Sequence, residues 1–395
     1  MNQSTGPAEA PAVRNYGNSS ARPGQGPNPG AWEVQRWLWA NTGLPGLAKC
    51  HRVRWRTNIE VLVSMAGDVH YRGFCRCHSV WACPLCAPSI RQGRARLTGA
   101  ALRPFVASGG GVLHSTYTLP HNVGDRLVPL FDAVTRSWNS VVTDKVVRQL
   151  RGDLGLHFLR STEVTVGENG WHPHLHVGEV CKVPLSRDQV IEYRREAFRA
   201  WCSAVERHGY RVPSERYGLS MVRADADMGD YVSKVQGLAD ELHRMDRKSG
   251  KTEAPFSVLR RAVAGDERAA SLWSEYELGT KGRRALFASR NFFKVCPVPE
   301  VPDDVLLAAI ESEASVVVGE LRPDMAHLLV NHPQGFEGFA EMVGPGTSEA
   351  WSAALAWLSG TAPWWLSEGG WERAAQELRD ERAPARAERM DEVMF

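Results

Sequence analysis

Two β-rich runs joined by a short polar segment constrain the fold of this chain more than any other feature of its sequence. The runs cover residues 156–166 and 171–180, and Gly167-Glu168-Asn169-Gly170 separates them. An Asn-Gly pair between two such runs is a strong signal for an antiparallel hairpin. We therefore predict an α+β fold, an antiparallel sheet with flanking helices. The further elements expected in this part of the chain are strands at 112–119 and 219–223 and helices at 126–150 and 186–208.

The second run of the hairpin carries a histidine pattern, WHPHLHV, over residues 171–177. Because alternate residues of a strand share a face, His174 and His176 project together. Two imidazoles spaced in this way can chelate a divalent ion. His172 has the same parity, but Pro173 distorts that end of the strand, which makes His172 a weaker candidate. A solvent-facing, histidine-rich strand is the alternative interpretation.

The register of the hairpin places a carboxylate on the histidine face. If residues 169–170 form a two-residue turn, Glu163 lies opposite His176. If the loop consists of residues 167–170, Glu163 lies opposite His174. Both registers bring Glu163 to the two imidazoles. Two histidines and one carboxylate with open coordination positions suit Mg²⁺ or Mn²⁺.

A second polar pattern, DMGDYVSK, covers residues 227–234. On a helix, positions i, i+4 and i+7 lie along one face, so Asp227, Tyr231 and Lys234 form a polar stripe on an expected helix. A lone tyrosine on a helix is more often a packing residue. The stripe therefore gains its weight from the histidine strand upstream.

Five of the eight cysteines fall between Cys50 and Cys86. The N-terminus lacks the regions of a signal peptide, so the cluster indicates metal ligation rather than disulfides. Cys83-Pro84-Leu85-Cys86 has the spacing of a zinc knuckle, and tetrahedral zinc needs two further ligands. Free buried cysteines are the alternative. The candidates for the two further ligands are Cys50, Cys77, Cys75, His78 and His51.

Charge is distributed unevenly along the chain. Residues 297–395 carry 6 basic and 18 acidic residues, a net charge of −12, whereas residues 1–296 carry a net charge of +14. A basic body suggests a nucleic acid as partner, and the acidic segment would compete with phosphates for it. Solvated surfaces of either sign are the alternative. The basic residues expected to contact the DNA backbone are Arg91, Arg94, Lys281, Arg283 and Arg284.

A family resemblance follows from these motifs. The two-histidine strand followed by Tyr-x-x-Lys resembles the HUH endonucleases, and within them the plasmid rolling-circle replication initiators with one catalytic tyrosine. The first family block, a strand that ends in Thr-Leu-Pro-His, is similar to residues 113–121. The metal-binding block is similar to residues 169–177 and the tyrosine block to residues 227–234. Two further segments, 79–86 and 275–286, look like those of actinobacterial plasmid initiators, and the resemblance covers roughly residues 45–295.

The resemblance implies a mechanism and completes the ligand sets. It implies an HUH nuclease fold with an RRM-like core, in which Mg²⁺ or Mn²⁺ on His174, His176 and Glu163 acts on single-stranded origin DNA. Tyr231 would attack the scissile phosphate to give a 5′-phosphotyrosine, with Lys234 lowering the pKa of the tyrosine or balancing phosphate charge. The acid four residues before the tyrosine is commonly Glu in the family, whereas this chain has Asp227, whose expected role is to activate water for a second cleavage. Likeness to the family also favours Cys50 and Cys77 as the ligands that join Cys83 and Cys86 around zinc.

The expected organisation has four segments. They are a disordered tail at 1–30, a zinc-binding module at 31–100, an HUH endonuclease domain at 101–295, and an acidic, mostly helical region at 296–395 with helices at 303–319, 349–358 and 371–391. No apolar run approaches the roughly 18 residues of a membrane span, so a cytoplasmic protein without a membrane partner is expected. A host helicase and a DNA polymerase are the expected protein partners. Two alternatives remain at this point, a transposase of the same superfamily and a non-catalytic, zinc-dependent DNA-binding regulator.

Overall fold

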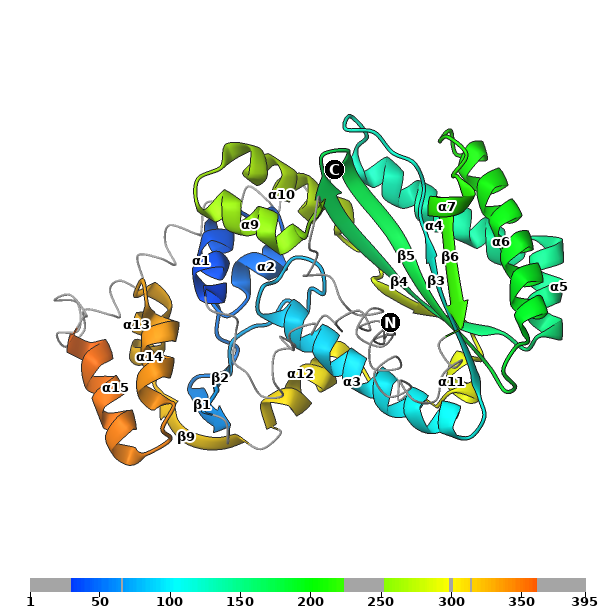
Figure 1. Cartoon of the computed structure of the whole chain (residues 1–395). Helices are drawn as coiled ribbons and strands as arrows, with labels where there is room; N and C mark the ends of the chain where they lie inside the picture. The colour runs from blue at the N-terminus through cyan, green and yellow to red at the C-terminus, as the bar shows by residue number, and fades with distance from the viewer. Residues whose placement is uncertain (1–29, 65–66, 224–251, 298–300, 313–314, 361–395) are drawn as a thin grey trace, which may run out of the picture.

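The computed structural model describes residues 30–64, 67–223, 252–297, 301–312 and 315–360, which form antiparallel sheets flanked by helices (Figure 1). The predicted α+β class is confirmed. Asp227, Tyr231 and Lys234 lie outside the described residues, as do the N-terminal tail and the helix expected at 371–391. None of the helices in the described ranges combines the length and apolarity that crossing a lipid bilayer requires.

The larger sheet has the strand order β6-β3-β5-β4-β7, and β8 also pairs with β4. Every pair in it is antiparallel. The histidine strand β5 lies between β3 and β4, away from the edges of the sheet. The strands are β3 (Gly111–Tyr117), β4 (His157–Gly167), β5 (Gly170–Cys181), β6 (Leu219–Arg223), β7 (Thr252–Glu253) and β8 (Leu286–Ala288).

The hairpin of β4 and β5 has the register in which Glu163 pairs with His174. The ladder continues to a Gly167–Gly170 pair, so the turn residues are 168–169 rather than 169–170. Gly170 is needed at its position for two reasons. Its φ of +84° is left-handed, and a Cβ there would lie 3.0 Å from the carbonyl oxygen of Asn122.

Helices cover one face of this sheet. Figure 1 shows α4, α5 and α6 packed together beside the strands. Tyr117 of β3 contacts the rings of Trp138 and Trp201 edge-on, with ring centroids 5.1 and 5.2 Å apart. The helix expected over residues 126–150 is two helices, because the Asp144 side chain accepts from two backbone N–H groups and starts a new helix. The helices are α4 (Leu127–Thr143), α5 (Lys145–Asp153), α6 (Arg187–Arg207) and the short α7 (Glu215–Gly218).

The opposite face of the sheet is divided into two halves. The half far from the hairpin turn is apolar: Val112, Leu159 and Val180 pack against Leu102 of α3 (Cys86–Ala107) and Phe292 of α11 (Phe292–Val295). By strand alternation this is the face that carries the histidines, which occupy the half nearer the turn. Since α3 begins at Cys86, one continuous helix joins the cysteine cluster to the sheet.

The smaller sheet has the order β2-β1-β9 and joins the two ends of the described chain. Residues 303–319 were expected to form one helix. Helix α12 covers Asp303–Ser312, whereas residues 315–319 belong to strand β9, which pairs with β1, so the helix prediction was wrong over residues 315–319. The Trp32 ring stacks on Phe336 at 3.9 Å, so N-terminal and C-terminal residues share one core. The elements are β1 (Ile59–Ser64), β2 (Val69–Arg72), β9 (Ser315–Leu321), α1 (Ala31–Asn41), α2 (Pro45–Lys49), α12 (Asp303–Ser312), α13 (Pro323–Asn331), α14 (Gly335–Val343) and α15 (Ser348–Gly360).

Two further helices, α9 (Pro255–Val263) and α10 (Glu267–Thr280), lie between the sheets in Figure 1. Tyr276 of α10 stacks on Trp171 of β5, and its hydroxyl donates to the carbonyl oxygen of Trp81 at 3.3 Å. Through Tyr276, the cysteine loop and the histidine strand are held against the same helix.

Candidate metal centres

The strand alternation of the hairpin brings His174, His176 and Glu163 together. The Nε2 atoms of the two imidazoles lie 2.7 and 2.8 Å from the same oxygen, Oε2 of Glu163. All three side chains are buried, and their donor atoms lie within 4.8 Å of one another. Three donors that converge at this distance around one point are arranged as ligands of a single ion.

In a neutral imidazole, a proton on Nδ1 leaves a lone pair on Nε2, the atom that faces Glu163. Nδ1 of His174 lies 3.3 Å from the carbonyl oxygen of His172, which only accepts, so this contact favours the tautomer with the proton on Nδ1. Nε2 of the neutral ring then turns a lone pair toward Glu163. Two lone pairs at 2.7 Å repel unless a cation or a proton lies between them. The donor set therefore fits a divalent ion, which would be held by two neutral imidazoles and one carboxylate.

Strand β3 and the loop that follows it supply polar partners to the histidines of β5. Thr116 of β3 pairs with His176 across the ladder, and its hydroxyl lies 3.3 Å from Nδ1 of that ring. His121 places Nε2 2.8 Å from Nδ1 of His172 and Nδ1 2.9 Å from the carbonyl oxygen of Asn169. No separate role was predicted for Thr116 or His121. Their contribution depends on the β3–β5 register, which no local pattern specifies.

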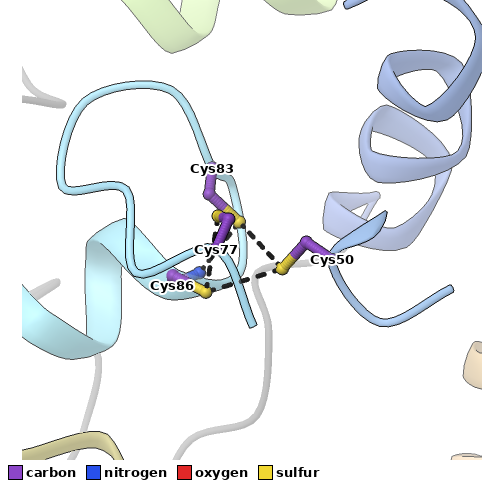
Figure 2. A group of neighbouring side chains, drawn as sticks. All are labelled: Cys50, Cys77, Cys83 and Cys86. Carbon is purple, nitrogen blue, oxygen red and sulfur yellow. Dashed lines mark hydrogen bonds between the residues drawn. The ribbon is translucent and has the colours of Figure 1, made fainter. Parts of the chain in front are cut away.

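The second centre is built from four cysteines. Figure 2 shows the thiols of Cys50, Cys77, Cys83 and Cys86 converging from the end of α2, the following loop and the start of α3. The sulfur–sulfur distances are 3.7 Å (Cys50–Cys83), 3.6 Å (Cys50–Cys86) and 3.9 Å (Cys77–Cys86). Tetrahedral zinc with Zn–S bonds of about 2.3 Å requires sulfurs roughly 3.8 Å apart, whereas a disulfide requires about 2.05 Å. The cluster is consistent with structural zinc.

The local structure around the cysteines favours a thiolate at Cys86, whereas the pKa of Cys50 is raised, first by its hydrogen bond with the Cys77 thiol. The backbone N–H of Cys86 donates to the sulfur of Cys83 at 3.3 Å, the contact that the knuckle spacing allows. Hydrogen bonds from neighbouring thiols, that of Cys50 first, hold the pKa of Cys86 well below its usual range. Burial instead raises the pKa of Cys83. Four deprotonated sulfurs at these distances need a cation, and zinc binding would release their protons.

The other ligand candidates do not join the four sulfurs. His51 is buried and lies 3.3 Å from the sulfur of Cys50, and burial lowers its pKa to about 3, which keeps the ring neutral. Cys75 is half-buried and is not one of the grouped ligands. His78 is exposed and lines a neighbouring cavity. Gln35, which the sequence analysis did not single out, is fully buried and bonds the carbonyl oxygen of Leu47 at 3.2 Å beside the cluster.

The basic residues expected to contact DNA lie in different surroundings. Arg91 is buried and donates to the carbonyl oxygen of Val80. Arg94 forms an ion pair with Asp303 at 2.7 Å. Arg283 forms one with Asp132 at 2.6 Å. Among the residues that the structure describes, Lys281 and Arg284 are exposed and form no ion pair.

Comparison with known proteins agrees with part of this description. "Protein rep" of Streptomyces lividans is 28% identical to the chain over 344 residues, in an alignment that covers 68% of the chain and 74% of that protein. The two proteins are distantly homologous. A "Neomycin resistance protein" of Streptomyces cyanogenus is 31% identical over 137 residues, which covers 28% of the chain and 31% of that protein. No protein-family model and no solved structure matches the chain.

Proposed function

We propose that the chain is a replication initiator of a plasmid, which nicks and rejoins one strand of origin DNA through a tyrosine nucleophile. The observation that carries this proposal is the buried group of His174, His176 and Glu163 on a central pair of strands. The distant homology to "Protein rep" over 68% of the chain supports it, since that relative covers far more of the chain than the resistance protein does.

In this mechanism, metal binding, nucleophilic attack and charge compensation are assigned to different residues. His174, His176 and Glu163 would hold Mg²⁺ or Mn²⁺, which would withdraw electron density from the scissile phosphate. The hydroxyl oxygen of Tyr231 attacks the phosphorus. A bond from the tyrosine oxygen to phosphorus forms and the bond from phosphorus to the 3′ oxygen breaks. The phenolic proton is transferred in net terms to the leaving 3′ oxygen, and the resulting 3′ hydroxyl primes a polymerase. Lys234 balances the phosphate charge.

Rejoining reverses the same exchange. A free 3′ hydroxyl attacks the phosphotyrosine, the phosphodiester re-forms and Tyr231 regains its proton, so no external energy source is needed. Asp227 lies four residues before the tyrosine in sequence, and we assign to it the activation of water for the second cleavage. A host helicase and a DNA polymerase would act with the nicked origin.

The decisive experiment uses labelled single-stranded oligonucleotides, tiled across the DNA that flanks the gene, together with Mn²⁺. The expected result is a covalent protein–DNA adduct on one strand, which Tyr231→Phe and His176→Ala both abolish. His157→Ala, a histidine of β4 outside the cluster, should leave adduct formation unchanged. A protein that regulates without nicking would retain its function in Tyr231→Phe. Adducts on insertion-element ends would instead favour a transposase.

A further inference from the structure

A cavity of about 640 Å³ lies between the cysteine loop and the segment that follows α10. This volume is in the usual range for a ligand site. Four of the five basic residues singled out in the sequence line it, although they come from separate parts of the chain. They are Arg94 of α3 and Lys281, Arg283 and Arg284 after α10, and the imidazole of His78 joins them from the cysteine loop.

A tight turn presents Lys281 at the edge of this cavity. The N–H of Arg283 donates to the carbonyl oxygen of Thr280 at 3.1 Å. Lys281 has φ −54° and ψ 126°, and Gly282 has a left-handed φ of +71°. These angles define a type II turn, which needs glycine at its third position. The helix thus ends in a fixed turn that directs the following basic residues to the cavity.

The charges that line the cavity do not balance one another. Asp303 neutralises Arg94 and Asp132 neutralises Arg283. Lys281 and Arg284 are exposed and form no ion pair or side-chain hydrogen bond within the described part of the chain. The uncompensated charge is therefore positive. A polyanion matches it, because each phosphate it places there releases counterions.

The cysteine loop forms a fixed wall of the cavity. The indole N–H of Trp81 donates to the carbonyl oxygen of Arg283 at 2.8 Å, and Tyr276 donates to the carbonyl oxygen of Trp81. His78 has a left-handed φ of +51°, a conformation that persists in a non-glycine residue only when its surroundings hold it. Trp81 and Arg283, which line the cavity from two separate segments, are thus held together by a hydrogen bond to a backbone carbonyl oxygen.

The cavity also adjoins the strand that carries the metal ligand Glu163. The N–H of Thr162 donates to the carbonyl oxygen of Ala285 at 2.9 Å, and Ala285 lines the cavity. Paired backbones lie about 4.8 Å apart, so one wall of the cavity is a single strand spacing from the residue next to Glu163. A DNA strand bound at the metal centre that passes over this edge of the sheet meets Lys281 and Arg284.

We propose that this cavity binds backbone phosphates of single-stranded DNA next to the cleavage site, with Lys281 and Arg284 as the contacting cations and the zinc-bound loop as its wall. This inference rests on the proposed function only for the claim that the cavity lies next to a cleavage site. The phosphate binding itself is a property of the cavity and is testable without nicking.

The test measures binding of fluorescent oligo(dT) by the full chain at several NaCl concentrations, without added divalent metal. Lys281→Ala/Arg284→Ala should weaken binding at low salt roughly tenfold and reduce the slope of log Kd against log salt by about 1.4, since each single-strand contact contributes about 0.7. The matched control is Lys182→Ala/Arg187→Ala, an exposed Lys–Arg pair after the far end of β5. The control should bind as the unmodified protein does.

The two proposals fail in different ways. If Lys281→Ala/Arg284→Ala and the control lose affinity equally, or neither does, the cavity is not a phosphate site, whatever the nicking assay shows. If the cavity variant alone loses affinity while the unmodified protein forms no adduct on any tiled oligonucleotide, the phosphate site stands and the nicking mechanism falls. Trp81→Phe keeps an aromatic ring but loses the indole N–H that donates to the Arg283 carbonyl oxygen. This variant should also weaken oligo(dT) binding while it retains zinc.

Discussion

Glu163 is the residue on which the charge balance of the histidine centre depends. One of its oxygens lies within hydrogen-bond distance of two imidazole nitrogens, and the side chain is buried. A buried carboxylate is costly unless it is paired, and neutral imidazoles do not supply the opposite charge. A divalent cation would balance this arrangement, and the carboxylate would contribute most of the attraction for it.

Glu163→Gln tests this balance while preserving shape. The amide keeps an oxygen ligand but loses the negative charge, so the Mn²⁺ concentration needed for half-maximal nicking should rise by roughly 10- to 100-fold. The measurement is a Mn²⁺ titration of adduct formation. Oligo(dT) binding without metal should not change, because phosphate contacts and chemistry belong to different residues. Unchanged Mn²⁺ dependence would remove Glu163 from the ligand set.

At the same scale, the sequence predicted which candidate ligands converge better than it predicted the residues that contact them. Period-two alternation brought His174, His176 and Glu163 to one face without knowledge of the fold. Thr116 touches His176 only because β3 pairs in one particular register, and that register is set by packing of the whole sheet. Gln35 lies beside the zinc cluster from a helix whose sequence shows only ordinary amphipathicity.

At the scale of elements, local signals succeeded where the partner was close in sequence. The hairpin and helix α6 were both predicted. The helix was expected at 186–208 and covers Arg187–Arg207, so each boundary differs by one residue. Strand β9 was mistaken for helix because its partner β1 lies some 250 residues away, and the run Val316-Val317-Val318 favours a strand only when that partner is present. The four-segment division of the chain remains a prediction, although β9 and β1 share a sheet across it.

The hairpin turn offers a prediction with a matched control. Gly170→Ala places a Cβ 3.0 Å from the Asn122 carbonyl oxygen in a left-handed conformation, so it carries a steric cost beyond the φ penalty of about 1–2 kcal/mol. Gly209→Ala, with nearly the same φ and nothing within 4 Å, carries the φ penalty alone. In urea unfolding, Gly170→Ala should be the more destabilising of the two. Equal decreases in the free energy of unfolding would mean that the loop at residues 122–123 moves away from the new Cβ without cost.

The zinc cluster permits a similar comparison between two neighbouring cysteines. Cys83→Ser removes one of four converging sulfurs and should abolish the roughly one equivalent of bound zinc, with loss of folding in the N-terminal part. Cys75→Ser changes a half-buried cysteine outside the group and should keep the metal. Metal analysis of the purified proteins and thermal unfolding give both readouts. A metal-free parent protein of unchanged thermal stability would remove the zinc assignment.

At the scale of the whole molecule, the charge asymmetry of the sequence acquires a structural meaning. The acidic segment was expected to act as a tethered competitor of DNA. In the described residues it supplies β9 and four helices, and Arg36 and Arg94 of the basic part form ion pairs with its Glu337 and Asp303. At least two of the 18 acidic residues of this segment therefore pair with the basic part of the chain. Truncation after Val295 would remove core residues along with the charge.

Phe336 gives the clearest test that the C-terminal region completes the N-terminal core. Its ring stacks on Trp32 at an angle of 4°, and its carbonyl oxygen accepts from the hydroxyl of Tyr71 at 2.9 Å. Phe336→Ala should cost about 3–5 kcal/mol through lost burial and the cavity left behind. Because Trp32 lies on the helix that also carries Gln35, the variant should also release zinc to a chelator faster than its parent.

The control for this change is Glu341→Ala, an exposed position on the same helix, which should alter neither the unfolding midpoint nor zinc release. If Phe336→Ala unfolds like its parent and retains zinc equally well, the two ends of the chain are stable independently. In that case the acidic region could act as a tethered competitor of DNA without contributing to the core. Its truncation would then measure the competition for DNA without unfolding the rest of the protein.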